Sequence, residues 1–245
     1  MPISYRFFLD GETFECGSME DLVNLDNYHD IVLIDCYHEK LTILPTLPNK
    51  LIMLDCSNNK LTVLPTLPNS LEYLQCYYNE LIVLPTLQNS LTYLGCHNND
   101  LTVLPTLPNS LTYLCCHNNK LTLLPILPNC LKYLYCEKNN LTTLPTLPNS
   151  LTQLYCYSNK LTILPVLPKS LILKDYHNNP VDTYIKEKCG GNIDIYHREN
   201  EIFATKLVRW YLDCRENPSF KFCRDRLNRE YDALMDEDSC GIMVD

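Results

Sequence analysis

The strongest constraint on the fold is an internal repeat of 20 residues that runs through the middle of the chain without an insertion. The unit reads L-x-x-L-x-C-x-x-N-x-L-T-x-L-P-x-L-P-N-S, as in residues 91–110. A period of this length indicates a solenoid, because one copy cannot bury its own leucines and stacked copies can. The opening leucines are Leu51, Leu71, Leu91, Leu111, Leu131, Leu151 and Leu171, and Ile31 keeps the same spacing.

Each copy divides into a strand and a return segment. The alternation of leucine, leucine and cysteine predicts a short strand with one buried face, since strand side chains point to opposite sides in turn. Two prolines three residues apart follow in most copies, for example Pro105 and Pro108. Such a pair is incompatible with a helix interior, so the return segment is predicted to be extended and polyproline-like. The stacked strands are expected to form a parallel sheet on the concave side.

The pattern L-x-x-L-x-C-x-x-N-x-L resembles the leucine-rich repeat, with cysteine at the third apolar position. Its L-P-x-L-P ending is similar to the short repeats of secreted bacterial effectors. The regular copies, rich in cysteine and asparagine, also resemble leucine-rich-repeat proteins encoded by large amoebal DNA viruses. The resemblance covers residues 31–180. It implies a leucine-rich-repeat solenoid, or horseshoe, with a concave parallel β-sheet, extended convex segments, a small N-terminal cap and a helical C-terminal cap.

Three regions are predicted: an N-terminal cap over residues 1–30, the repeat array over 31–180, and a C-terminal capping region over 181–245 with two helices and a frayed tail. The first region contains Ser18-Met19-Glu20-Asp21, which resembles a capping box at a helix start.

The order of elements expected after the array is a short helix, a strand and then two longer helices. The short helix is predicted over residues 181–188 and ends at Gly190-Gly191. Ile193 and Ile195 then predict one more strand. Apolar residues at helical spacing predict the last two helices over 199–216 and 220–234.

An asparagine follows each predicted strand and has a structural interpretation. The chain turns inward at this point and exposes backbone donors and acceptors to a dry interior. An amide side chain both donates and accepts hydrogen bonds, so it satisfies these groups. The predicted ladder consists of Asn59, Asn79, Asn99, Asn119, Asn139, Asn159 and Asn179.

Seven cysteines share one inward strand position and form a column along the array. A tetrahedral metal site needs ligands that converge from several directions, which one sulfur per strand does not provide. A free cysteine packs like a small apolar side chain. We therefore expect reduced, metal-free thiols at Cys36, Cys56, Cys76, Cys96, Cys116, Cys136 and Cys156.

Composition and missing motifs exclude several classes of function. The net charge of −9 argues against a general nucleic-acid binder. No apolar run approaches the ~18 residues of a membrane span, and Arg6 and Asp10 interrupt the apolar start in a way that a secretory signal does not. No phosphate-binding loop, H-E-x-x-H or G-x-S-x-G motif occurs. We expect no enzyme activity, no cofactor, no membrane partner and an intracellular location in the cytoplasm, including that of a host cell.

The concave strand positions are rich in tyrosine and histidine and are the candidate partner-binding site. An aromatic sheet with little charge has the composition of protein interface hot spots, so we predict a protein ligand on the concave face. The β-propensity of tyrosine explains the same rows equally well. The candidate residues are Tyr73, Tyr77, Tyr93, Tyr113, Tyr133, Tyr135, Tyr155, Tyr157, His97 and His117.

Three alternatives to a simple binding module are compatible with a repeat array of this kind to different degrees. An adaptor for ubiquitin transfer would choose substrates with the array and recruit the machinery with helices 199–235. Single-stranded nucleic acid stacked on the tyrosines is disfavoured by the acidic balance. A metal held by His97 and His117 is disfavoured, because two ligands without a nearby carboxylate rarely hold a metal. If either imidazole contacts an acidic group of the partner, the affinity is expected to rise below pH ~6.5, where an ordinary imidazole protonates.

Overall fold

The computed structural model describes residues 2–7 and 11–216 of the chain. It divides into two compact units, Met1–Thr183 and Tyr184–Asp245. The helix expected over 220–234 and the frayed tail lie outside the described residues. No helix within the described part is long and apolar enough to cross a membrane.

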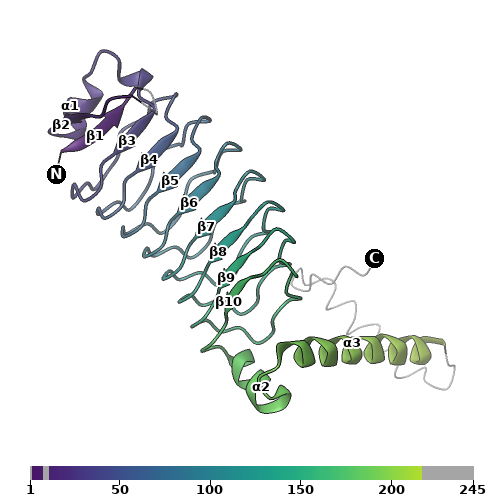
Figure 1. Cartoon of the computed structure of the whole chain (residues 1–245). Helices are drawn as coiled ribbons and strands as arrows, with labels where there is room; N and C mark the ends of the chain where they lie inside the picture. The colour runs from purple at the N-terminus through teal and green to yellow at the C-terminus, as the bar shows by residue number, and fades with distance from the viewer. Residues whose placement is uncertain (1, 8–10, 217–245) are drawn as a thin grey trace. The chain divides into compact units, whose positions relative to one another are not determined.

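The array folds into stacked coils, each of which contributes one three-residue strand to a parallel sheet (Figure 1). Neighbouring strands keep the same register throughout, so Leu94 lies beside Leu114 and Leu114 beside Leu134. Each repeat position therefore forms a straight column along the sheet, as the leucine-rich-repeat prediction requires, and that fold class is confirmed. The strands are β3 (Leu33–Asp35), β4 (Met53–Asp55), β5 (Tyr73–Gln75), β6 (Tyr93–Gly95), β7 (Tyr113–Cys115), β8 (Tyr133–Tyr135), β9 (Gln153–Tyr155) and β10 (Leu173–Asp175).

The core is a set of leucine columns that only neighbouring coils can bury. The opening leucines from Leu51 to Leu151 are 0–1% exposed, whereas Leu171, in the last coil, is only half-buried. Burial of one leucine side chain contributes about 1.5–3 kcal/mol, so the inner coils stabilise one another. The prolines keep the return segments extended, and no helix forms between β3 and β10.

The N-terminal region extends the sheet and covers its first edge. It comprises β1 (Ile3–Arg6), β2 (Phe14–Cys16), α1 (Met19–Val23) and a 3-10 turn η1 (Tyr28–Asp30). Strand β1 pairs antiparallel with β3 on one side and with β2 on the other, so the outer edge of β3 is not left unpaired. The Asp21 N–H donates to Ser18 Oγ over 3.1 Å, which is the N-cap bond that the capping-box pattern predicted.

Two helices follow the array, α2 (Pro180–Cys189) and α3 (Ile193–Glu216). Helix α2 matches the predicted span and is followed by Gly190 in the left-handed conformation, with φ of 59°. The strand expected at Ile193 and Ile195 is wrong, because α3 begins there. Asn192 Oδ1 accepts hydrogen bonds from the backbone N–H groups of Asp194 and Ile195, and this cap starts a helix in place of a strand.

One residue of each coil, directly before the ladder position, has a positive φ. Left-handed backbone costs an ordinary L-residue roughly 1–2 kcal/mol, whereas asparagine tolerates it. Three inner coils place asparagine there, and another places Lys138, with φ of 55°. The residues at this position are His38, Asn58, Tyr78, Asn98, Asn118, Lys138, Ser158 and Asn178, with φ values of 49–61°, and Lys40 of the first coil also has a positive φ, of 57°.

We expect Lys138→Asn to raise the free energy of unfolding by about 0.5–1 kcal/mol, because asparagine relieves the left-handed strain. Urea unfolding followed by circular dichroism measures the change. Lys160→Asn is the matched control, since it removes the same charge at an exposed position without a positive φ. An equal gain in both variants would assign the effect to charge and contradict the backbone argument.

Candidate functional site

The ten candidate aromatic residues lie on one face of the sheet, which we call the sheet face. It consists of the outward side chains of β3–β10 and of the residue two positions beyond each strand. The constant register aligns these positions into three columns. The first column holds Tyr73, Tyr93, Tyr113 and Tyr133, the second holds Tyr135 and Tyr155, and the third holds Tyr77, His97, His117 and Tyr157.

Most neighbouring rings in each column stack on one another. Tyr93 and Tyr113 have ring centroids 4.3 Å apart and planes 8° from parallel. The Tyr73–Tyr93 pair is similar at 4.2 Å. Adjacent strands are spaced at roughly 4.7–4.9 Å, close to an aromatic stacking distance, so a tyrosine repeated in every coil stacks without distortion. The first column ends less regularly, with Tyr113 and Tyr133 tilted by 44° at 5.7 Å.

Stacking makes the sheet face less exposed than the sequence predicts. The tyrosines of the three columns are half-buried, because each ring covers its neighbours. Burial raises the pKa of Tyr73, Tyr77 and Tyr113 above the usual value for tyrosine, so these hydroxyls are neutral donors near pH 7. The rings also contribute to the packing of the array, at roughly 0.5–1.5 kcal/mol for each stacked pair.

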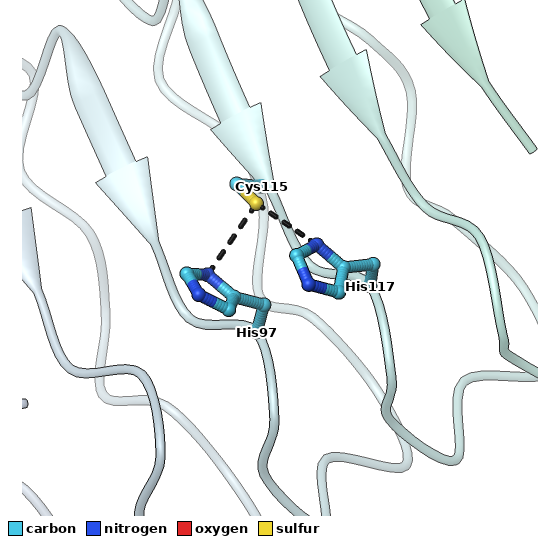
Figure 2. Close-up of side chains that lie close together, drawn as sticks. All are labelled: His97, Cys115 and His117. Atoms are coloured by element: carbon cyan, nitrogen blue, oxygen red, sulfur yellow. Dashed lines mark hydrogen bonds between the residues drawn. The ribbon is translucent and has the colours of Figure 1, made fainter. Parts of the chain in front are cut away.

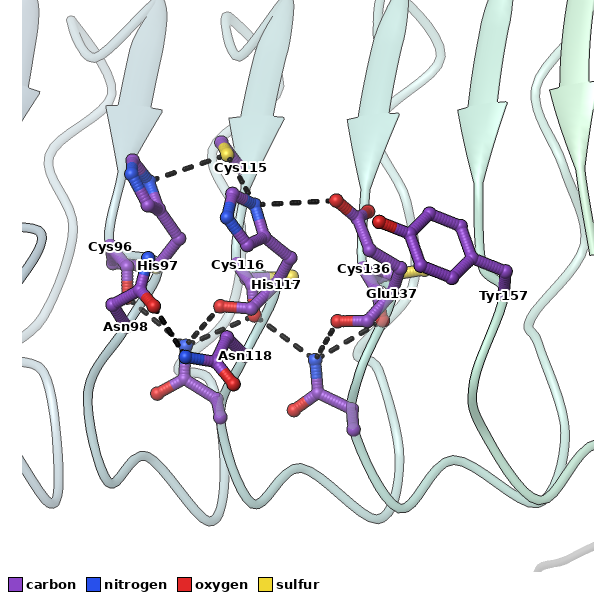
Figure 3. A network of polar contacts seen from close by, with 12 residues as sticks. Cys96, His97, Asn98, Cys115, Cys116, His117, Asn118, Cys136, Glu137 and Tyr157 are labelled. Atoms are coloured by element: carbon purple, nitrogen blue, oxygen red, sulfur yellow. Dashed lines mark hydrogen bonds and ion pairs between the residues drawn. The ribbon is translucent and has the colours of Figure 1, made fainter. Parts of the chain in front are cut away.

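A polar cluster that was not evident from the sequence forms where the second and third columns meet: Cys115 of the second column with His97, His117 and Glu137 of the third (Figures 2 and 3). Cys115 Sγ lies 3.4 Å from His97 Nδ1 and 3.1 Å from His117 Nδ1. Glu137 Oε1 lies 3.6 Å from His117 Nδ1. The statement that the histidine pair lacks a nearby carboxylate is therefore wrong, since the next coil supplies one.

The histidines of this cluster are also less basic than expected. Burial, helped by the neighbouring His117, lowers the pKa of His97 to about 4. Burial, helped by Lys138, also lowers the pKa of His117. The expected titration near the ordinary imidazole pKa is wrong for His97, because its ring lies between Tyr77 and His117 and has lost solvent. Its imidazole is neutral at pH 7.

The asparagine side chains point into the turns and bond the backbone of two coils. Asn119 Nδ2 donates to the carbonyl oxygens of Cys96, Cys116 and His117 at 3.0–3.2 Å. The Leu101 N–H donates to Asn119 Oδ1 over 2.9 Å. The same set of bonds occurs at Asn59, Asn79, Asn99, Asn139, Asn159 and Asn179. Their polar atoms are occupied by backbone groups.

The return segments carry a further column of exposed side chains that was not predicted from the sequence. Its side chains are aliphatic and 51–72% exposed. They are not apparent in the sequence, because each stands next to a leucine of the repeat pattern that is buried. They are Ile43, Val63, Val83, Val103, Leu123 and Ile163.

Stacked coils of constant length, closed by a buried amide ladder, define a repeat solenoid that presents a broad surface. No family model and no curated protein matches the chain, but solved structures do. The leucine-rich-repeat domain of a Shigella effector is 32% identical, with a TM-score of 0.54 over 61% of this chain and 70% of that one. The chain belongs to the leucine-rich-repeat family and has the character of the effector type.

Two further neighbours are YopM proteins. YopM from Yersinia pestis is 34% identical over 60% of this chain, with a TM-score of 0.53. YopM from Yersinia enterocolitica is 36% identical over 57% of this chain, with a TM-score of 0.50. The chain spans 49% and 36% of these two proteins, respectively. The similarity therefore concerns the repeat array, and a solenoid of this type is a protein-interaction module.

Proposed function

We propose that the chain is a non-enzymatic binding module whose sheet face receives a protein partner. The observation that supports this most is the gathering of ten aromatic side chains in three columns across β5–β9, still half open to solvent. Stacked rings are already ordered, so binding costs little side-chain entropy. Their neutral hydroxyls add hydrogen-bond donors to a large apolar contact area.

The charge pattern of the sheet face indicates the chemistry of the partner. The acidic strand positions, Asp35, Asp55 and Asp175, lie in β3, β4 and β10, towards the two ends of the array. Between them the strand positions carry tyrosine, glutamine, glycine and cysteine. The partner surface expected over β5–β9 is therefore apolar with uncharged hydrogen-bonding groups, because the acidic side chain in this part of the sheet face, Glu137, is only 8% exposed and a charged surface would lose its hydration there with little counter-charge in return.

We expect Tyr113→Ala/Tyr133→Ala to weaken partner binding by roughly 10- to 1,000-fold, the range of interface hot spots. The free energy of unfolding should fall by about 1–3 kcal/mol, because the variant also loses ring contacts. The measurement is capture from cell lysate with quantitative mass spectrometry, followed by calorimetric titration of the captured protein and thermal unfolding of each variant.

Thr122→Ala/Thr142→Ala is the matched control, because it changes exposed return-segment positions in the same two coils. A third variant, Val103→Ser/Leu123→Ser, tests the aliphatic column. Binding that survives loss of the tyrosines but not of the aliphatic side chains would move the site to the return segments. Unchanged capture together with a large loss of stability would mean that the tyrosine rows serve only packing.

A second candidate function is the adaptor for ubiquitin transfer, and one observation favours it. In α3, Ile202, Phe203, Leu207 and Val208 are all exposed, Phe203 by 67%. Apolar side chains at helical spacing with this exposure suit a second protein contact. In the same capture experiment, an adaptor would retain ubiquitin-transfer components after the tyrosine substitutions, whereas a one-site module would lose its whole captured set.

A further inference from the structure

The polar cluster on the sheet face is assembled from three consecutive coils. Cys115 ends strand β7, and His117 follows it two residues later on the same side of the chain. His97 and Glu137 hold the position of His117 in the coil before and the coil after. The parallel register therefore brings four potential metal ligands together, and Figure 2 shows both imidazoles with a nitrogen directed at the sulfur.

The spacing of the His97, Cys115 and His117 ligand atoms suits a tetrahedral ion, and Glu137 approaches this group from the side of His117. Zinc binds thiolate sulfur at ~2.3 Å and imidazole nitrogen at ~2.0–2.1 Å. Tetrahedral angles then separate sulfur from nitrogen by about 3.5 Å and nitrogen from carboxylate oxygen by about 3.4 Å. The observed separations are 3.4 and 3.1 Å for sulfur to nitrogen and 3.6 Å for nitrogen to oxygen. One ligand atom each from His97, Cys115 and His117 lies within 4.8 Å of the others.

The donor set is also suited to zinc in kind and in charge. Two neutral imidazoles, one thiolate and one carboxylate balance a divalent cation, and sulfur with nitrogen selects zinc-like metals over calcium or magnesium. Among the eight strands of the array, only β7 ends in cysteine. Its neighbour in register is Gly95, which has no side chain to occupy the space beside the sulfur.

Glu137 provides an independent indication that this site binds a cation. The residue is only 8% exposed, and its Oε2 is buried with no hydrogen-bond partner among the residues that the structure describes. An unpaired buried carboxylate oxygen is strongly unfavourable unless a charge or a donor compensates it. Its other oxygen, Oε1, faces His117 Nδ1 (Figure 3). A cation between the two side chains would remove this deficit.

We propose that His97, Cys115, His117 and Glu137 bind one zinc-class divalent metal ion on the sheet face. Binding needs a small rearrangement of the rings. The imidazoles stack at 4.4 Å with planes 20° apart, and the lone pairs of nearly parallel rings do not converge on one point. Both rings rotate towards the sulfur when the ion binds. Metal binding therefore changes the stacking of the third column, which continues from His97 to Tyr77. The proposal does not depend on the protein partner.

The experiment uses the full chain, reduced with a phosphine and freed of metal by a chelator. Cobalt(II) is the optical probe and zinc(II) is titrated by calorimetry. We expect one equivalent of cobalt to bind with the visible bands of a tetrahedral ion and a thiolate charge-transfer band, and zinc to displace it. Zinc should also raise the melting temperature, since it binds the folded state.

Cys115→Ser and His97→Tyr should each lower the affinity for zinc by at least about 100-fold, beyond the 10- to 100-fold loss typical of outer-shell changes. Tyrosine is a conservative choice at 97, because Tyr77 holds that position one coil earlier and stacks on His97. Cys130→Ser and His177→Tyr are matched controls outside the cluster and should bind like the parent protein. Metal-free melting curves establish that every variant is folded.

Two results would overturn the proposal. One is a folded parent protein that binds neither metal stoichiometrically. The other is equal affinity in the parent protein, Cys115→Ser and His97→Tyr, which would place the metal on other thiols. Glu137→Gln tests the fourth ligand separately: an affinity loss of about tenfold or more supports it, and an unchanged affinity removes Glu137 from the site.

Discussion

Replacement of Asn119 by alanine is expected to lower the free energy of unfolding by about 3–5 kcal/mol, a large fraction of the stability of a typical domain. The side chain makes four hydrogen bonds to backbone groups of two coils. The loss is uneven. The carbonyls of Cys96 and Cys116 keep a bond from Asn99 and Asn139, respectively. The buried Leu101 N–H loses its partner in the ladder, Asn119 Oδ1.

Urea unfolding followed by circular dichroism measures this loss. Thr122→Ala is the control, because it truncates an exposed side chain three residues away and should stay within about 0.5 kcal/mol of the parent. Asn119→Asp keeps the acceptor for Leu101 but removes the donors and adds a buried charge, so we expect it to be at least as damaging. A loss below about 1 kcal/mol in Asn119→Ala would show that water replaces the amide and would refute the ladder as a source of stability.

The second large effect concerns the cysteine column. We expect its thiols to react with iodoacetamide at least about 1,000-fold more slowly than Cys130 in the native protein, because reaction must wait for unfolding. All seven column cysteines are 0% exposed, whereas Cys130 is half-buried. Burial raises the pKa of the Cys56 and Cys96 thiols well above their usual value, so the reactive thiolate is scarce. Cys56 Sγ also donates to the Gln75 carbonyl at 3.4 Å.

Peptide mapping after a light label in buffer and a heavy label in denaturant measures the rates. A chelator is present, so that metal at Cys115 does not protect that thiol. The denatured, unreduced protein should take up heavy label at every column cysteine. Thiols that stay unlabelled there would be disulfide-bonded, and column thiols that react in buffer as fast as Cys130 would contradict a closed core.

The solenoid was predictable because its signal is repeated. A single Leu-x-x-Leu-x-Cys segment fits several folds, but a constant period forces the leucines of all coils into register, and hydrophobic burial then leaves one arrangement. Outside the repeats, the prediction rested on a short local pattern alone, and there the predicted strand was wrong. Ile193 and Ile195 alternate like a strand, yet the side chain of Asn192 caps two backbone N–H groups and starts α3.

The polar cluster was harder to predict because its members are spread over three coils. His97 and His117 share a repeat position and are easily paired, whereas Cys115 stands outside the cysteine column, next to its member Cys116. Two rules are sufficient to predict that the cluster residues lie together. Side chains two positions apart in extended chain share a face, and residues 20 positions apart lie side by side in adjacent coils. The half-burial of the tyrosine rows was not predictable from position alone, since it depends on how the rings turn towards one another.

The unvarying register also affects how such a chain can change over generations. Every inner coil presents nearly the same leucines, cysteine and asparagine to its neighbours, so the gain or loss of one whole 20-residue unit rejoins matching surfaces. Recombination between near-identical units can therefore alter the length of the array without a new core. The tyrosine rows would grow or shrink with it. The four-residue cluster has no such tolerance, because a unit inserted between residues 120 and 121 would separate Glu137 from His117.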